Sequence, residues 1–418
     1  MAMQKNSSEY NEQLHVVIVG HIDHGKSTLI GRLLYDTGSL PGEKIEEIKA
    51  FSHAQGKAME FAYVMDHLEE ERHRGITIDT AQTFFKTDKR RYVIIDAPGH
   101  REFLKNMFTG SVQAEAAMLL IDAEEGIQEQ TRRHCHILSL IGIKQIVVLV
   151  NKMDLIGYSK ARFDEISTAA TRILSRLSLE PTYIIPLSAL LGENVASGSK
   201  QISWYSGPTV LTALDSFEVQ QIEERELRLP VQDVYHLDGR EIAVGRIEAG
   251  RLKKKQHVLI LPDQKRAVVV SIEKYLENGL HTAFTGECIG FCLDTPVHRG
   301  HVLVSEAHKK SPSPRITETI HGNLFWMSEE PCHKGDAITF KCVTQEVQGR
   351  IEKIYKRYDP AEVEVVQVDA SEIRTAEIAE VSIALKKPVV VDLFDTIPEM
   401  GRFVLEREGH PLAGGIVL

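Results

Sequence analysis

The stretch GHIDHGKS at residues 20–27 decides the fold of this chain. It fits the pattern GxxxxGKS, follows an apolar run at residues 16–19 and precedes the helix-like segment TLIGRLLYD at residues 28–36. Between a strand and a helix, such a loop points backbone N–H groups at phosphate oxygens, with the helix N-terminus behind them. The stretch therefore predicts a phosphate-binding loop, or P-loop.

The side chains of the loop extend this prediction. Lys26 brings a positive charge to the phosphates and is a candidate catalytic residue, and the Ser27 hydroxyl is a candidate ligand of Mg²⁺. Glycines allow the backbone to approach the phosphates closely. The residues predicted to bind the phosphates of a nucleotide are Gly20, His21, Asp23, His24, Gly25, Lys26, Ser27 and Thr28.

A second motif predicts which base is bound. NKMD at residues 151–154 follows the buried strand-like run IVVLV. The Asp154 carboxylate can accept the N1–H and 2-amino hydrogens of guanine, whereas adenine offers no such donor pair. Asn151 is expected to bond the guanine edge and tie this loop to the P-loop, and Lys152 to lay its apolar stem over the base. Ser188, Ala189 and Leu190 are expected to complete the guanine pocket.

Two further motifs are predicted to sense the γ-phosphate. Asp96 ends the strand-like run YVIID and can hold Mg²⁺ through water. Gly99 can offer its N–H to the γ-phosphate, and His100 can orient the attacking water. Thr77, in the sequence RGITID, is the candidate second hydroxyl on Mg²⁺, reached only when the γ-phosphate is present.

The pattern of apolar runs and turn residues along the chain predicts three domains. Up to about residue 210, apolar runs alternate with helical stretches, which indicates a mostly parallel sheet covered by helices. Short β-branched runs separated by Gly, Pro, Asp and Lys follow, and SPSP at residues 311–314 is a predicted linker. The prediction is an α/β GTP-binding domain at 1–220 and two antiparallel β-barrel domains at 221–312 and 313–418.

Composition limits the other classes of protein. No stretch reaches the roughly 18 apolar residues of a membrane helix, and the N-terminus has no secretion signal, so we expect a cytoplasmic protein with no membrane. Five scattered cysteines disfavour a disulfide framework. The net charge of -10 means that any nucleic-acid contact would need a local basic patch.

Taken in order, GHIDHGKST, RGITID, DAPGH, NKMD and SAL, followed by two barrels, resemble translation-factor GTPases over essentially the whole chain. The segment at residues 61–79 looks like the extended switch I of elongation factor 1-alpha and of the GTPase subunit of bacterial sulfate adenylyltransferase. The segments at 130–159 and 186–211 are more similar to the latter subunit. The resemblance thus favours the sulfate adenylyltransferase subunit.

That resemblance implies a role and a partner. The GTPase subunit works with a smaller catalytic subunit that makes adenylyl sulfate and pyrophosphate from ATP and sulfate, and GTP hydrolysis drives the unfavourable step. It also implies that Ile22 and Ile76 flank the water path as apolar gate residues. His24 departs from the Asp-Asp pair that this subunit family usually carries at Asp23 and the next position. The alternative is an elongation-factor-like GTPase that delivers aminoacyl-tRNA to the ribosome.

Overall fold

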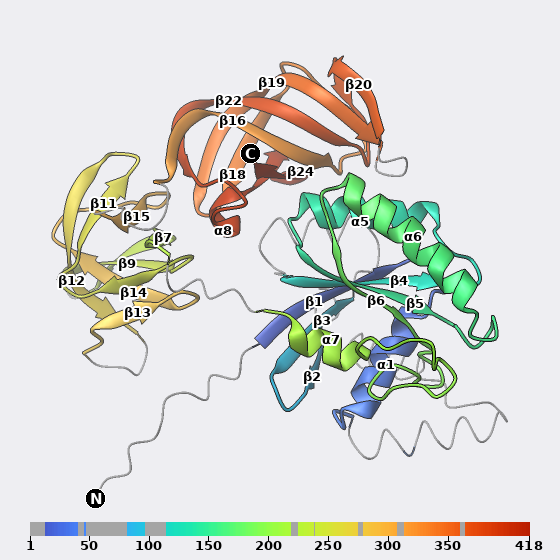
Figure 1. Cartoon of the computed structure of the whole chain (residues 1–418). Helices are drawn as coiled ribbons and strands as arrows, with labels where there is room; N and C mark the ends of the chain where they lie inside the picture. Colours follow the sequence, from blue (N-terminus) through green and yellow to red (C-terminus); the bar gives the residue numbers. More distant parts are fainter. Residues whose placement is uncertain are drawn as a thin grey trace, which may run out of the picture. The chain divides into compact units, whose positions relative to one another are not determined.

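The computed structural model describes residues 13–40, 46, 82–96, 114–218, 225–237, 239–274, 279–306, 313–359 and 364–418. The described parts fall into two compact units, a first that runs to about residue 219 and a second that covers most of the rest (Figure 1). Among the described helices, none is long and apolar enough to cross a membrane.

The first unit is built on a six-stranded sheet. Its β1 strand lies in the interior, between β3 and β4, and only β2 runs antiparallel to its neighbour. This confirms the predicted mostly parallel sheet. In spatial order the strands are β2 (Gln82–Lys86), β3 (Arg91–Asp96), β1 (Gln13–Gly20), β4 (Ala116–Asp122), β5 (Gln145–Asn151) and β6 (Pro181–Pro186).

Helices cover both faces of this sheet because its strands are apolar on both sides. All seven residues of β4 are buried, as expected for a parallel strand between two helical layers. One core cluster joins alternate β1 residues such as Val16 and Ile18 to the apolar faces of α1 and α7, and α5 and α6 lie on the other face (Figure 1). The described helices of this unit are α1 (Lys26–Asp36), α5 (Glu129–Leu140), α6 (Lys160–Arg176) and α7 (Val210–Ser216).

In the residues that the structure describes, the second unit is antiparallel β apart from a short helix, α8 (Pro398–Gly401). One seven-stranded sheet has the order β7-β15-β11-β12-β14-β9-β8, with β10 and β13 paired beside it. Its strands are β7 (Arg228–Pro230), β8 (Asp233–Leu237), β9 (Arg240–Arg246), β10 (Arg251–Lys253), β11 (His257–Leu261), β12 (Lys265–Glu273), β13 (Thr282–Phe284), β14 (Cys288–Leu293) and β15 (Val302–Ser305).

The other seven-stranded sheet of this unit closes on itself. Its order is β18-β23-β24-β16-β22-β19-β20, and β18 also pairs with β19, so six strands form a barrel with β20 at the side. Antiparallel barrel-type folds after the α/β part were predicted and are confirmed. The strands are β16 (Arg315–Trp326), β17 (Cys332–His333), β18 (Ala337–Cys342), β19 (Gln345–Asp359), β20 (Glu364–Ala370), β21 (Glu372–Ile373), β22 (Ile378–Val391), β23 (Arg402–Arg407) and β24 (His410–Val417).

A buried ion pair joins the two sheets of the second unit. The Arg228 guanidinium donates to both carboxylate oxygens of Asp392, at 2.9 and 3.0 Å, and the two side chains are 0% and 2% exposed. A small apolar cluster that contains Val304 and Ile397 draws on both sheets as well. The division of this unit into domains at 221–312 and 313–418 stays a prediction.

Replacing Arg228 with methionine is expected to lower the free energy of unfolding by about 3 to 5 kcal/mol, because Asp392 becomes a buried carboxylate without its cation. The matched control is Arg240→Met, which removes an exposed pair with Glu273 and should cost less than about 1 kcal/mol. Urea unfolding followed by Trp326 fluorescence, in a Trp204→Phe background, measures both. Equal midpoints for the two variants would contradict the prediction.

Candidate functional site

The phosphate loop leaves β1 at its carboxyl end and enters α1. Asp23 and Gly25 have positive φ angles of 63° and 93°, so the loop turns its N–H groups inward in the manner of an anion-binding nest. A Cβ atom at Gly20 would lie 2.7 Å from the Leu120 carbonyl oxygen, and one at Gly25 would lie 2.5 Å from Nδ2 of Asn151. Both glycines are therefore required by close packing.

The first turn of α1 leaves its N–H groups for a ligand. Gly25 occupies the N-cap position and no side chain caps the helix. The helical ladder starts with the Leu29 N–H, which donates to the Gly25 carbonyl at 2.9 Å. Ser27 and Thr28 are half-buried in this first turn, where the positive end of the helix dipole favours an anion.

The Lys26 ammonium lies across the loop. Its Nζ donates to the carbonyl oxygens of Gly20 at 2.9 Å and His21 at 3.0 Å. Burial lowers the pKa of Lys26, and the carboxylates of Asp96 and Asp23 oppose that shift. A phosphate in the loop would supply the negative charge that this partly desolvated ammonium favours.

The residues next to the loop offer oxygen ligands suited to Mg²⁺. Asp96 ends β3 and is the register partner of Ile18 in β1, so its carboxylate stands at the same sheet edge as the loop. A carboxylate and the Ser27 hydroxyl are hard oxygen donors of the kind that Mg²⁺ takes. Bound there, Mg²⁺ would neutralise phosphate charge. Thr77, the other predicted ligand, lies outside the described residues.

Asn151 joins three loops of the predicted site. Its Nδ2 donates to the His24 carbonyl oxygen at 2.8 Å, and its Oδ1 accepts from the Ala189 N–H at 2.9 Å. The side chain is almost fully buried, so both bonds lie in a setting where losing one is costly. Asn151 thus connects the phosphate loop, the base loop and the SAL segment, as the sequence predicted for the first two.

The other residues predicted for the base pocket follow Asn151 in the chain or flank Ala189, whose N–H contacts Asn151. Lys152 has a positive φ angle of 61°, which changes the direction of the backbone directly after β5. Asp154 is half-buried. Ser188 is fully buried and its Oγ accepts from the Leu191 N–H at 3.3 Å. The Leu190 side chain is 40% exposed.

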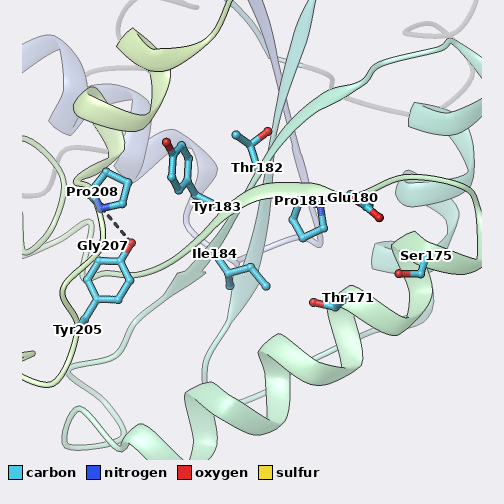
Figure 2. Close-up of a pocket in the computed structure, with 10 residues that line it drawn as sticks. All are labelled: Thr171, Ser175, Glu180, Pro181, Thr182, Tyr183, Ile184, Tyr205, Gly207 and Pro208. Carbon is cyan, nitrogen blue, oxygen red and sulfur yellow. Dashed lines mark hydrogen bonds between the residues drawn. The ribbon is translucent and has the colours of Figure 1, made fainter.

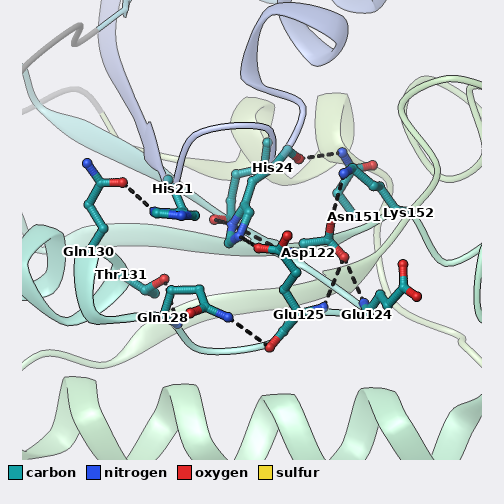
Figure 3. Close-up of polar contacts among 12 residues, drawn as sticks. His21, His24, Asp122, Glu124, Glu125, Gln128, Gln130, Thr131, Asn151 and Lys152 are labelled. Carbon is teal, nitrogen blue, oxygen red and sulfur yellow. Dashed lines mark hydrogen bonds and ion pairs between the residues drawn. The ribbon is translucent and has the colours of Figure 1, made fainter.

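The structure adds contacts that sequence reasoning missed (Figure 3). The Lys152 ammonium lies 2.7 Å from the carboxylate of Asp122, which the sequence analysis did not single out. The His24 ring, predicted to belong to the phosphate site, is fully buried and has Nε2 3.2 Å from Oε2 of Glu125. Only the backbone of His24 can therefore face the nucleotide. Asp122 could have been noticed as the polar end of a wholly apolar strand.

Several predicted residues have no described position. Ile76, Thr77, Gly99 and His100 lie outside the described residues, so their roles stay predictions. Ile22 is described and is 65% exposed on the phosphate loop. An exposed apolar side chain on this loop suits a gate residue. Its predicted partner, Ile76, lies outside the described residues, so the gate stays a prediction.

A hollow elsewhere on the first unit lies between α6 and β6 (Figure 2). The Tyr205 hydroxyl closes one end by donating to the Pro208 carbonyl at 3.1 Å. Its lining contains no cation, so it does not suit a phosphate and adds no residue to the nucleotide site. The lining residues are Thr171, Ser175, Glu180, Pro181, Thr182, Tyr183, Ile184, Tyr205, Gly207 and Pro208.

Known proteins match this chain along its length. Residues 11–224 match the family described as elongation factor Tu GTP binding domain, and residues 319–418 match GTP-eEF1A C-terminal domain-like. Elongation factor 1-alpha of Pyrococcus furiosus is 38% identical over 97% of each chain, and that of Thermoplasma acidophilum is 38% identical over 96% of each. A solved structure of sup35 complexed with GDP aligns at a TM-score of 0.45 and 24% identity, covering 100% of this chain and 97% of that one.

These matches separate the two resemblances drawn from the sequence. Both relatives are named elongation factor 1-alpha, and the preferred resemblance to a sulfate adenylyltransferase subunit finds no support among them. The broader resemblance to translation-factor GTPases is confirmed, and with it GTP or GDP and Mg²⁺ as cofactors. From its P-loop to its last barrel, the chain belongs to the translation-factor GTPase family.

Proposed function

We propose that this protein is an elongation-factor GTPase that delivers aminoacyl-tRNA to the ribosome in the cytoplasm. The observation that carries the proposal is the similarity to proteins named elongation factor 1-alpha over 97% of the chain. This similarity spans the β unit as well as the nucleotide site, so it extends to the part that would meet a partner. The β domains would cradle the acceptor arm of the tRNA.

In this proposal the nucleotide site acts as a switch. Thr77 would complete the Mg²⁺ ligands together with Ser27 only when the γ-phosphate is present, and hydrolysis would release its segment. His100 would orient the attacking water once a partner has placed it, with Ile22 and Ile76 as the apolar gate in front of it. Lys26 would stabilise the charge that develops on the phosphates.

The test is single-turnover GTP hydrolysis with and without the partner. We expect programmed ribosomes plus aminoacyl-tRNA to raise the rate by about 10³-fold or more, as partner activation does in other GTPases. His100→Ala should abolish most of this increase while GTP binding, measured by equilibrium titration, stays within about twofold, because the residue acts on the water.

A second arm distinguishes the sulfate-activation hypothesis. The same assay is run with an ATP-sulfate adenylyltransferase catalytic subunit in place of ribosomes, and adenylyl sulfate is measured. We expect no stimulation in this arm. Stimulation by the adenylyltransferase subunit, without stimulation by ribosomes, would overturn the proposed function and leave the family assignment intact.

A further inference from the structure

A buried carboxylate sits behind the base loop. Asp122 is the last residue of β4 and is 2% exposed. Its Oδ1 accepts from the backbone N–H groups of Glu124 at 2.7 Å and Glu125 at 3.3 Å, and its other oxygen, Oδ2, lies 2.7 Å from the Lys152 ammonium (Figure 3). Burial raises the pKa of Asp122, but the Lys152 ammonium and the two N–H groups outweigh it, so the net pKa is lower than usual. The carboxylate therefore stays ionised at neutral pH.

This contact fixes a side chain that the nucleotide needs. A free lysine side chain samples many rotamers, and ordering it costs conformational entropy. With its ammonium held by Asp122, Lys152 has its apolar stem ordered before any base arrives. The side chain remains 32% exposed, so part of the stem is available as a wall for a planar base.

The same turn also supports the phosphate loop. The His24 Nδ1 lies 3.3 Å from the backbone N of Asp122, and Nε2 lies 3.2 Å from Oε2 of Glu125. Burial lowers the pKa of His24, so the neutral ring is the relevant form. The tautomer with its hydrogen on Nε2 donates to Glu125 and accepts the Asp122 N–H at Nδ1, whereas the other tautomer donates from Nδ1 to the Leu120 carbonyl oxygen, 3.2 Å away. Each half of the nucleotide site is thus attached to residues 122–125.

We propose that Asp122 is a positioning residue of the nucleotide site. It holds Lys152 of the base loop through its carboxylate and His24 of the phosphate loop through its N–H, and in this way sets how long guanine nucleotides remain bound without touching them. The proposal rests on GTP binding alone, so it is independent of the RNA partner proposed above. The result of its test does not depend on whether ribosomes stimulate GTP hydrolysis.

The decisive variant is Asp122→Asn. The amide oxygen can still accept from the N–H groups of Glu124 and Glu125, so the turn is kept, but the charge that holds Lys152 is lost. We expect dissociation of fluorescently labelled GDP and GTP to become about tenfold faster for both nucleotides, since a charge-assisted bond that orders the base wall is removed. Single-turnover hydrolysis of bound GTP should stay within about twofold, because no reacting atom is contacted.

The matched control is Asp164→Asn on α6. Asp164 also pairs with a lysine, Lys160, at 2.6 Å, but on an exposed helix face. GDP and GTP should dissociate from the Asp164→Asn variant at the same rates as from the wild type. Faster dissociation in the control as well would show a nonspecific effect of the substitution and would count against the proposal.

A double-mutant cycle separates positioning from mere stability. Lys152→Met breaks the same pair from its partly exposed side, and dissociation should again become faster. The double variant Asp122→Asn with Lys152→Met should dissociate no faster than Lys152→Met alone, because the lost interaction is shared. Additive effects on the dissociation rate, or an unchanged rate in Lys152→Met, would overturn the proposal even if Asp122→Asn fails to fold.

Discussion

Replacing Asp154 with asparagine is expected to lower the affinity for GTP by about 10³-fold or more, because a site built for two base hydrogens then faces them with a single amide. The asparagine amide can instead donate to the 2-oxo group of xanthine. The affinity of this variant for xanthosine triphosphate should rise by a similar factor. Competition of each unlabelled nucleotide against labelled GDP measures both changes.

The change at Asp154 has a matched control on the neighbouring helix. Glu165→Gln also exchanges a carboxylate for an amide, in an exposed pair with Arg162, and should leave both affinities unchanged. If Asp154→Asn kept its preference for GTP, the assignment of Asp154 as the reader of the base would be wrong.

Gly25→Ala should lower the affinity for GTP and GDP by about 100-fold while the first unit remains folded, because backbone strain and a steric clash act together on one loop. The new methyl group would lie 2.5 Å from Nδ2 of Asn151, at a φ angle of 93° that L-residues rarely adopt. Relief requires Asn151 to move, and the bonds that connect the phosphate loop to the SAL segment would break with it. Isothermal titration with GDP gives the loss.

Gly38→Ala isolates the strain from the clash. Gly38 has a φ angle of 62°, but a Cβ there meets nothing within 4 Å. We expect this variant to lose about 1 kcal/mol of stability and to bind GDP normally. If both variants bound GDP equally well, the close packing of Gly25 against Asn151 would have no role in nucleotide binding.

The phosphate and base loops were predictable because their recognition chemistry is local in sequence. The glycines, Lys26 and Asp154 each stand in a short motif whose residue types follow from the ligand. The mostly parallel sheet covered by helices was equally accessible from the alternation of apolar runs and helical stretches. Asn151 could be assigned to the guanine edge and to the phosphate loop because its motif and that loop meet at one edge of the sheet.

The support behind these loops could not be predicted, because it depends on contacts between distant segments. His24 reaches Glu125 across 101 residues, and nothing local to His24 shows that its ring turns inward. Residues 130–159, which favoured the sulfate adenylyltransferase subunit, include most of α5 and all of β5, and the apolar residues of these two elements are buried. Similarity between buried residues reflects how the core packs, whereas the partner is selected by exposed residues, so this similarity did not identify the partner.

The interior position of β1 has a consequence for synthesis of the chain. The strand that carries the phosphate loop emerges first, yet its neighbours β3 and β4 end at Asp96 and Asp122. Until those residues leave the exit tunnel, an apolar strand has no sheet to join, and nascent chains in this state are prone to aggregate. We expect nascent chains arrested with Asp122 still inside the exit tunnel to be protease-sensitive at β1, and chains arrested after Asp122 has emerged to become protected.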